Sequence, residues 1–125
     1  PDVVERIASR SRATPRVANA LLKRIRDFAQ VHEKELTVEV CDEACRLFGI
    51  DPLGLTKDDR RYLETLQDGF KGGPAGVREL ASAMHEDADT LENVYEPYLL
   101  RLGFIERSSR GRLLTDKGKR YLLQS

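Results

Sequence analysis

Apolar residues recur at helical spacing along most of the chain, and a short stretch near its end alternates as a β-strand does. Residues 15–31 form the clearest helical pattern, and a second one follows Thr37 and ends at Gly49. Thr14 is a suitable N-cap for the first of these helices, with Pro15 at its first position. The expected inward positions are Val17, Leu21, Ile25 and Phe28 in the first helix and Cys41, Ala44, Cys45 and Phe48 in the second. Residues 2–11 are expected to end a further helix, with Val3, Val4 and Ile7 on one side.

A helix stop, a proline and a second glycine come together in the run Asp51-Pro52-Leu53-Gly54. This combination is typical of a linker. We therefore predict a small helical domain over 1–50, a linker over 51–55 and a second domain over 56–125. At about 50 residues the first piece lies near the lower limit for independent folding.

The second piece begins with three predicted helices. Thr56 caps the first, which ends at the Gly72-Gly73-Pro74 break; a short one carries Val77 to Met84. A longer helix after His85–Asp87 ends at Gly103 and is expected to turn these apolar side chains inward: Leu91, Val94, Tyr95, Tyr98, Leu99 and Leu102. Pro97 removes a backbone hydrogen bond inside it, which predicts a kink or a local change of helix type.

Two short strands, 104–107 and 112–115, are predicted next, joined by a turn over 108–111 in which Gly111 takes positive φ. A last helix over about 116–123 follows. Three helices and then a β-hairpin are the order of a winged-helix domain, with the helix-turn-helix at 77–102 and the wing at 104–115. The predicted fold class is mainly α.

Charge is balanced over the whole chain, with 21 basic and 21 acidic residues, but it is segregated. Residues 1–26 carry seven basic against two acidic side chains, and residues 104–125 carry six against two. The stretches between them are acidic. Two basic patches suggest two anion sites, although solvated helix faces explain such runs about equally well.

The wing is the better candidate for contact with DNA. Arg107, Arg110 and Arg112 surround Gly111 in one hairpin, which suits phosphate contact without sequence preference. The second helix of the helix-turn-helix is a poor reader of the major groove, because it carries these acids: Asp87, Asp89, Glu92 and Glu96. The alternative is a hairpin that is basic for solubility and edge protection.

Arg12 and Arg16 flank the start of the helix at residue 15, where cations oppose the helix dipole. Such a placement fits an external anion such as a phosphate, and an exposed arginine without a ligand explains it equally well.

Other chemistry has little support. Cys41 and Cys45 are expected to be core residues rather than zinc ligands, because only His32 and His85 accompany them. We find no nucleophilic triad and no phosphate-binding loop that ends in Gly-Lys-Ser/Thr, and we expect this chain alone not to hydrolyse a nucleotide. No apolar run approaches the length of a membrane span, and we see no signal peptide. Because the chain starts at Pro1 and its one methionine is Met84, we expect a fragment or a processed product.

Several segments taken together resemble the RuvB family, the bacterial AAA+ ATPases that drive branch migration of Holliday junctions. The segments that carry the resemblance to its lid are 11–19 (Ser-Arg-Ala-Thr-Pro-Arg-Val-Ala-Asn) and 26–29. Those that carry the resemblance to its winged helix are 72–76, 89–99 (Asp-Thr-Leu-Glu-Asn-Val-Tyr-Glu-Pro-Tyr-Leu), Gly103-Phe104 and Arg110-Gly111-Arg112. The chain departs from the family pattern at Ala13, where we expect glycine, and at Ser109, where we expect proline.

The resemblance implies an AAA+ lid followed by a winged helix, without the ATPase core. It implies that Arg16 is the sensor-2 arginine that reaches the terminal phosphate of ATP, with Pro15 near the nucleotide. It also implies that the wing residues Arg110, Gly111 and Arg112 lie towards DNA. ATP with magnesium, held mainly by the core, is the implied cofactor. Duplex DNA of Holliday junctions, a RuvA-type junction-binding protein and a homohexamer are the implied partners, in the bacterial cytoplasm.

Two other functions stay open from the residues alone. A free-standing winged-helix transcription regulator would need a groove-reading helix, which the acidic residues 87–96 disfavour. A protein-docking module would use the same fold without any contact between the wing and DNA.

Overall fold

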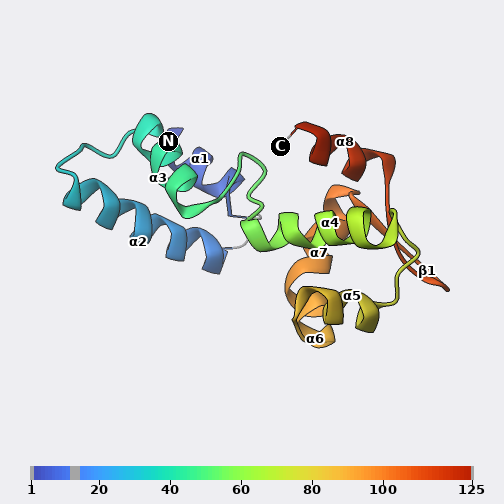
Figure 1. The fold of residues 1–125 in the computed structure, drawn as a ribbon. Helices are drawn as coiled ribbons and strands as arrows, with labels where there is room; N and C mark the ends of the chain where they lie inside the picture. Colours follow the sequence, from blue (N-terminus) through green and yellow to red (C-terminus); the bar gives the residue numbers. More distant parts are fainter. Residues whose placement is uncertain (1, 12–14, 125) are drawn as a thin grey trace. The chain divides into compact units, whose positions relative to one another are not determined.

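The computed structural model describes residues 2–11 and 15–124, which are mostly helical with one two-stranded antiparallel sheet (Figure 1). The chain divides into two compact units, residues 1–57 and residues 58–125. The division lies just beyond the segment 51–55 that the sequence suggests as a linker. The predicted fold class, a helical lid and a winged helix, is confirmed.

Three helices build the first unit: α1 (Asp2–Ser9), α2 (Pro15–Val31) and α3 (Val38–Phe48). Their packed faces share one core, formed by Ile7, Leu21, Ile25, Phe28, Ala29, Val40, Cys41, Ala44 and Cys45. The helix over 15–31 is confirmed at both ends. The predicted N-cap Thr14 lies outside the described residues.

Two apolar residues of the predicted helical patterns in the first unit are exposed. Val4 is exposed, because α1 turns only its Ile7 side towards the other two helices. Val17 is also exposed, because it faces a hollow at the surface of the first unit beside Leu21, Ile50 and Gly54. A helical pattern marks the apolar side of a helix, but a unit of three helices covers only part of that side.

The two cysteines are core residues, as expected. Cys41 and Cys45 are both free thiols and both buried on the inner face of α3. Burial raises the pKa of each thiol above its ordinary value, which keeps both in the neutral form that packs like a small apolar side chain.

The signals at the ends of α3 act as predicted. The Thr37 hydroxyl oxygen accepts a hydrogen bond from the Val40 N–H at 3.2 Å and caps the first turn. Gly49 closes the helix in the left-handed conformation, with φ of 76°.

The segment expected to be a linker is an ordered turn of the first unit. One carboxylate oxygen of Asp51 accepts hydrogen bonds from the Leu53 N–H at 3.0 Å and the Leu55 N–H at 2.9 Å. Leu55 is fully buried. A side chain on Gly54 would meet the Arg10 carbonyl at 3.0 Å, so the turn packs closely on the end of α1. The sequence signals correctly predict that α3 ends at Gly49 and that a turn follows over 51–55. The turn is ordered by hydrogen bonds.

The second unit has the helix order of a winged helix. It contains α4 (Lys57–Phe70), α5 (Val77–Met84), α6 (Ala88–Thr90), the π-helix η1 (Leu91–Tyr95), α7 (Glu96–Leu102), the strands β1 (Ile105–Ser108) and β2 (Gly111–Leu114), and α8 (Asp116–Gln124). Its fully buried side chains include Tyr62, Leu63, Leu66, Leu80, Leu91, Leu99 and Ile105. Tyr95 is buried and Tyr98 is half-buried, in line with their expected inward positions. Tyr121 is half-buried and stacks on Phe104.

The long helix predicted before Gly103 changes type along its length, which confirms the effect expected of Pro97. The Glu96 N–H donates to the Leu91 carbonyl five residues earlier, so the turn before the proline is a π-turn. Tyr95 and Glu96 are buried here, and Val94 is exposed. The prediction that Val94 faces inward is therefore wrong.

The wing is a tight hairpin. Ile105 pairs with Leu114, Arg107 with Arg112, and Ser108 with Gly111, which leaves Ser109 and Arg110 as the loop. Each strand is shifted by one residue from its predicted bounds. Gly111 has φ of 135°, as the predicted turn requires. On its other side β2 meets Ala75, which exchanges two backbone hydrogen bonds with Arg112.

None of the helices within the described part of the chain has the length and apolar character that crossing a membrane requires.

Candidate nucleic-acid interface

The tip of the wing presents Arg110. This residue is exposed in the loop of the hairpin, and its backbone N–H donates to the Ser108 hydroxyl oxygen at 3.2 Å. The same hydroxyl donates to the Gly111 carbonyl at 3.1 Å. The loop is therefore held by its own hydrogen bonds, and the Arg110 guanidinium extends from a fixed backbone. A cation that extends from an exposed hairpin is suited to contact with a phosphate.

The other two wing arginines both bind Glu96. Arg107 donates to Glu96 Oε1 at 3.0 Å, and Arg112 donates through Nε to Oε2 at 2.9 Å and through Nη2 to Oε1 at 3.0 Å. The side chain of Arg107 is 47% exposed and that of Arg112 15%. The three arginines that the sequence places together are thus unequal: Arg110 is exposed, Arg107 half-exposed and Arg112 largely buried.

Glu96 is fully buried, so the expectation that it adds to an exposed acidic face is wrong. The Tyr62 hydroxyl also donates to it, to Oε2 at 2.6 Å. Burial alone would raise the Glu96 pKa, but the hydrogen bonds from Arg112, Tyr62 and Arg107 outweigh it and hold the pKa below its ordinary value. The carboxylate is therefore charged, and it cancels one of the two positive charges beside it. Asp87 and Asp89 are exposed, as expected of an acidic helix.

Sequence reasoning did not find the roles of Glu96 and Tyr62. Tyr62 lies 34 residues before its partner, and nothing around it distinguishes it from an ordinary core aromatic. The only local signal near Glu96 was Pro97, which marked the change of helix type directly before this residue.

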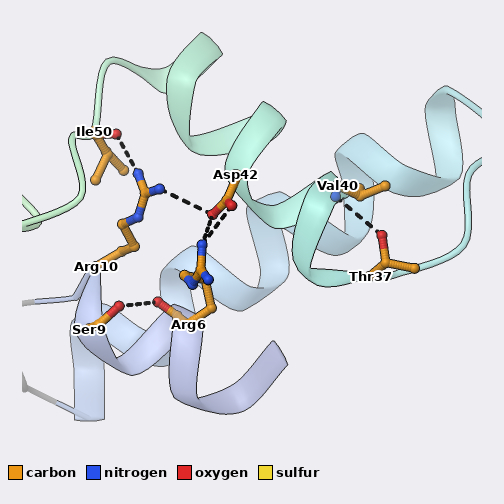
Figure 2. A network of polar contacts seen from close by, with 7 residues as sticks. All are labelled: Arg6, Ser9, Arg10, Thr37, Val40, Asp42 and Ile50. Atoms are coloured by element: carbon orange, nitrogen blue, oxygen red, sulfur yellow. Dashed lines mark hydrogen bonds and ion pairs between the residues drawn. The ribbon is translucent and has the colours of Figure 1, made fainter. Parts of the chain in front are cut away.

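Two arginines of the N-terminal basic stretch, residues 1–26, form hydrogen bonds within the first unit, as Figure 2 shows. Arg6 donates to both carboxylate oxygens of Asp42 at 2.6 Å, and Arg10 donates to Oδ1 of Asp42 at 3.1 Å and to the Ile50 carbonyl at 2.9 Å. Arg24 lies over the Phe48 ring, 4.0 Å from its centroid. The interpretation of all seven basic residues of 1–26 as one anion-binding patch is therefore wrong for Arg6 and Arg10.

Arg16 and Pro15 lie where the sequence places them, in the first turn of α2, and both are exposed. This turn contains no acidic residue. Its backbone N–H groups and the guanidinium together favour an anion. Arg12 and Ala13, which the sequence analysis also considered, lie outside the described residues.

Within residues 2–11 and 15–124, no three His, Cys, Asp or Glu side chains form a group that could hold a metal ion.

Two family models together match almost the whole chain. Residues 1–51 match the RuvB AAA lid domain, and residues 52–123 match the RuvB C-terminal winged helix domain.

Curated relatives are similar over nearly the full chain. The Holliday junction branch migration complex subunit RuvB of Lactobacillus helveticus is 48% identical over 94% of this chain, and that of a Synechocystis species is 48% identical over 98%. The chain spans about a third of the length of these relatives, 34% in each case.

Solved structures of the Thermotoga maritima RuvB Holliday junction branch migration motor have the same fold. One has a TM-score of 0.91 at 42% identity, over 95% of this chain and 40% of that one. Its P216G mutant gives 0.93 at 40% identity, over 98% and 41%. With a lid of three helices, an arginine-bearing wing and these matches over both units, the chain belongs to the RuvB family.

Proposed function

We propose that this chain works as the C-terminal part of an ATP-dependent DNA motor that drives Holliday junction branch migration in recombination and repair. The single observation that carries the proposal is the wing, a β-hairpin whose fixed loop presents Arg110 beside the half-exposed Arg107. The names of the relatives supply the junction as the substrate. In this proposal residues 1–50 are the lid, 51–55 the connection and 56–125 the DNA-binding domain.

The wing contacts the DNA backbone without sequence preference. Arg110 and Arg107 supply cations for phosphates, Gly111 allows the tight loop, and Arg112 holds the strand from inside. The exposed Asp87 and Asp89 would repel phosphates, which disfavours the groove-reading mode of a winged-helix regulator.

Anisotropy of labelled duplex and four-way-junction DNA, titrated with this chain across a salt series, tests the wing. The test variant is Arg110→Ala, because removing Arg107 and Arg112 as well would leave the buried Glu96 without its partners. We expect weaker binding and a slope of log K against log salt that is shallower by about 0.9, one phosphate contact. The matched control is Arg120→Ala on α8, an exposed arginine outside the wing, which keeps the slope.

Equal binding by the Arg110→Ala chain and the unaltered chain would contradict the wing contact. A sequence-specific footprint would favour a transcription regulator. Partner binding that is insensitive to salt, without DNA affinity, would favour a docking module.

The lid senses ATP through Arg16. An exposed guanidinium in a first helical turn free of acidic residues fits the terminal phosphate of a nucleotide, with Pro15 beside it. When bound, ATP supplies the free energy of hydrolysis; this chain contributes the cation that senses the phosphate. Magnesium and the hydrolytic groups are assigned to an ATPase core outside this chain. This chain by itself should therefore not hydrolyse ATP.

Steady-state ATP hydrolysis by the longer protein that carries this segment tests the lid. Arg16→Ala should abolish turnover while circular dichroism stays unchanged. Lys23→Ala, an exposed cation farther along α2, is the matched control and should keep turnover. Normal turnover in the Arg16 variant would rule out the sensor role. A homohexamer, a RuvA-type partner and a cytoplasmic location complete the proposal, by similarity to the family.

A further inference from the structure

The carboxylate of Glu96 joins four structural elements of the second unit. Its Oε1 accepts from Arg107 on β1 and Arg112 on β2, both at 3.0 Å, and its Oε2 accepts from Arg112 at 2.9 Å and from Tyr62 on α4 at 2.6 Å. Glu96 itself begins α7. Each carboxylate oxygen thus receives two hydrogen bonds, so the charged form is well satisfied although it is fully buried.

The two arginines use this carboxylate differently. Arg112 contributes both Nε and Nη2 and is only 15% exposed, which leaves it little to offer a ligand. Arg107 contributes only Nη2 and is 47% exposed. A guanidinium carries five N–H donors, so Arg107 retains donors for a second acceptor while Glu96 holds it in place.

The backbone before Glu96 is irregular. The π-turn Leu91–Tyr95 ends at Glu96 and buries two consecutive side chains, and Pro97 follows at once. The acid that lies under the wing strands thus directly follows an irregular turn, and π-turns of this kind occur often at functional sites.

We infer that Glu96 is a positioning residue for DNA contact: it fixes the Arg107 guanidinium in the free protein so that the remaining donors of Arg107 are ready for a backbone phosphate. The inference rests on the proposed contact between the wing and DNA. Ordering a long side chain before binding removes an entropic cost from association, so the contribution of Glu96 to affinity is favourable even though its charge repels DNA.

The charge of Glu96 and its positioning of Arg107 have opposite effects on DNA affinity, so the direction of the change in affinity on substitution distinguishes them. Glu96→Gln and Glu106→Gln each remove one negative charge, and Glu106 is an exposed residue of β1 next to Arg107. If charge alone acts, both variants bind duplex DNA as tightly as the unaltered chain or more tightly. We expect Glu96→Gln to bind about threefold to tenfold more weakly, with a salt slope shallower by about 0.9. Glu106→Gln should not bind more weakly.

A double-mutant cycle tests whether Glu96 acts through Arg107. The double variant Glu96→Gln/Arg107→Ala should then bind DNA no more weakly than Arg107→Ala, because the residue that Glu96 positions is gone and only the lost negative charge remains. Independent losses that add in the double variant would overturn the inference.

One measurement needs no variant and stands even if the Glu96→Gln variant loses the dispersed amide signals of a folded wing. NMR relaxation of the arginine Nε–H groups in the unaltered chain should show a rigid Arg107 and a mobile Arg110. An Arg107 as mobile as Arg110 would overturn the inference.

The DNA titrations separate this inference from the proposed function. If the unaltered chain binds DNA through Arg110 but Glu96→Gln binds as tightly as Glu106→Gln, only this inference fails. If the unaltered chain does not bind DNA, the proposed function fails with it.

Discussion

At the scale of single residues, two helical glycines show how much the surroundings matter. A Cβ added to Gly118 in α8 would clash with the Phe104 carbonyl oxygen and would lie 2.7 Å from the Leu114 side chain. A Cβ added to Gly69 in α4 would meet nothing closer than Thr65 at 4.0 Å. Gly118 therefore allows α8 to lie directly on the backbone where the wing begins, and Gly69 has no such role.

We predict opposite effects for the two substitutions. Gly118→Ala should destabilise the second unit by about 2 kcal/mol, because the nearest atom belongs to the backbone and cannot turn aside. Gly69→Ala should be neutral or stabilise by up to about 0.5 kcal/mol, because alanine favours the helix. Urea unfolding followed by tyrosine fluorescence measures both, since the chain has four tyrosines and no tryptophan. Equal effects of the two variants would contradict the close contact at Gly118.

At the scale of elements, α1 is joined to α3 by charge as well as by apolar packing. Asp42 on α3 binds Arg6 and Arg10, and the side chain of Arg10 is almost buried. Arg10 also reaches the Ile50 carbonyl after α3 (Figure 2). A buried guanidinium whose carboxylate is removed remains as an uncompensated charge.

We therefore predict that Asp42→Ala destabilises the first unit by about 3 kcal/mol, and that most of the loss comes from Arg10. The half-exposed Arg6 regains water and adds little. Thermal unfolding by circular dichroism measures the loss. Asp27→Ala, which removes an exposed acid of α2, is the matched control and should change stability by less than about 0.5 kcal/mol. A loss no larger at Asp42 than at Asp27 would show that α1 is held by apolar packing alone.

At the scale of the whole molecule, part of the basic charge of each unit is paired with an acid of the same unit. In the first unit one acid neutralises part of the N-terminal basic patch, and in the second one acid neutralises part of the wing. The arginine surface that stays exposed on the wing is that of Arg110 and about half of that of Arg107. The buried acid of the second unit also makes its stability depend on pH.

The sign of this pH dependence follows from Glu96. Its pKa in the folded protein lies below the ordinary value of 4.5, so the charged form stabilises the fold. This contribution is complete above the ordinary value and is lost as the pH falls through the lower, folded value. We predict that urea unfolding measured from roughly pH 6 to pH 3 shows the second unit losing stability more steeply in the unaltered chain than in Glu96→Gln. Parallel curves would show that the Glu96 carboxylate is not held in its charged form.

Much of the fold could be predicted because its signals are local. The helix over 15–31, the cap at Thr37, the stop at Gly49 and the hairpin around Gly111 each depend on residues within a few positions of one another. Backbone geometry and side-chain capping act over that same range, so the sequence displays them directly. The change of helix type at Pro97 belongs here too, because a missing N–H is a property of one residue.

The candidate sites were predicted less completely. The sequence brought Arg107, Arg110 and Arg112 into one hairpin and Arg16 into the first turn of a helix, and the structure places them so. It could not show that Arg112 is largely buried against Glu96 or that Arg6 and Arg10 face an acid. A charged residue looks the same in a sequence whether it meets water or a partner.

The sequence alone therefore determined the order and type of the elements, the family and the residues that carry positive charge. Only the tertiary structure decided which of those charges remain available. Tyr62 and Glu96 are 34 residues apart, and Arg6 and Asp42 are 36 apart. Pairings over such separations follow from how helices and strands pack. Local sequence carries no record of that packing, because the same residues would be ordinary surface charges if the elements met differently.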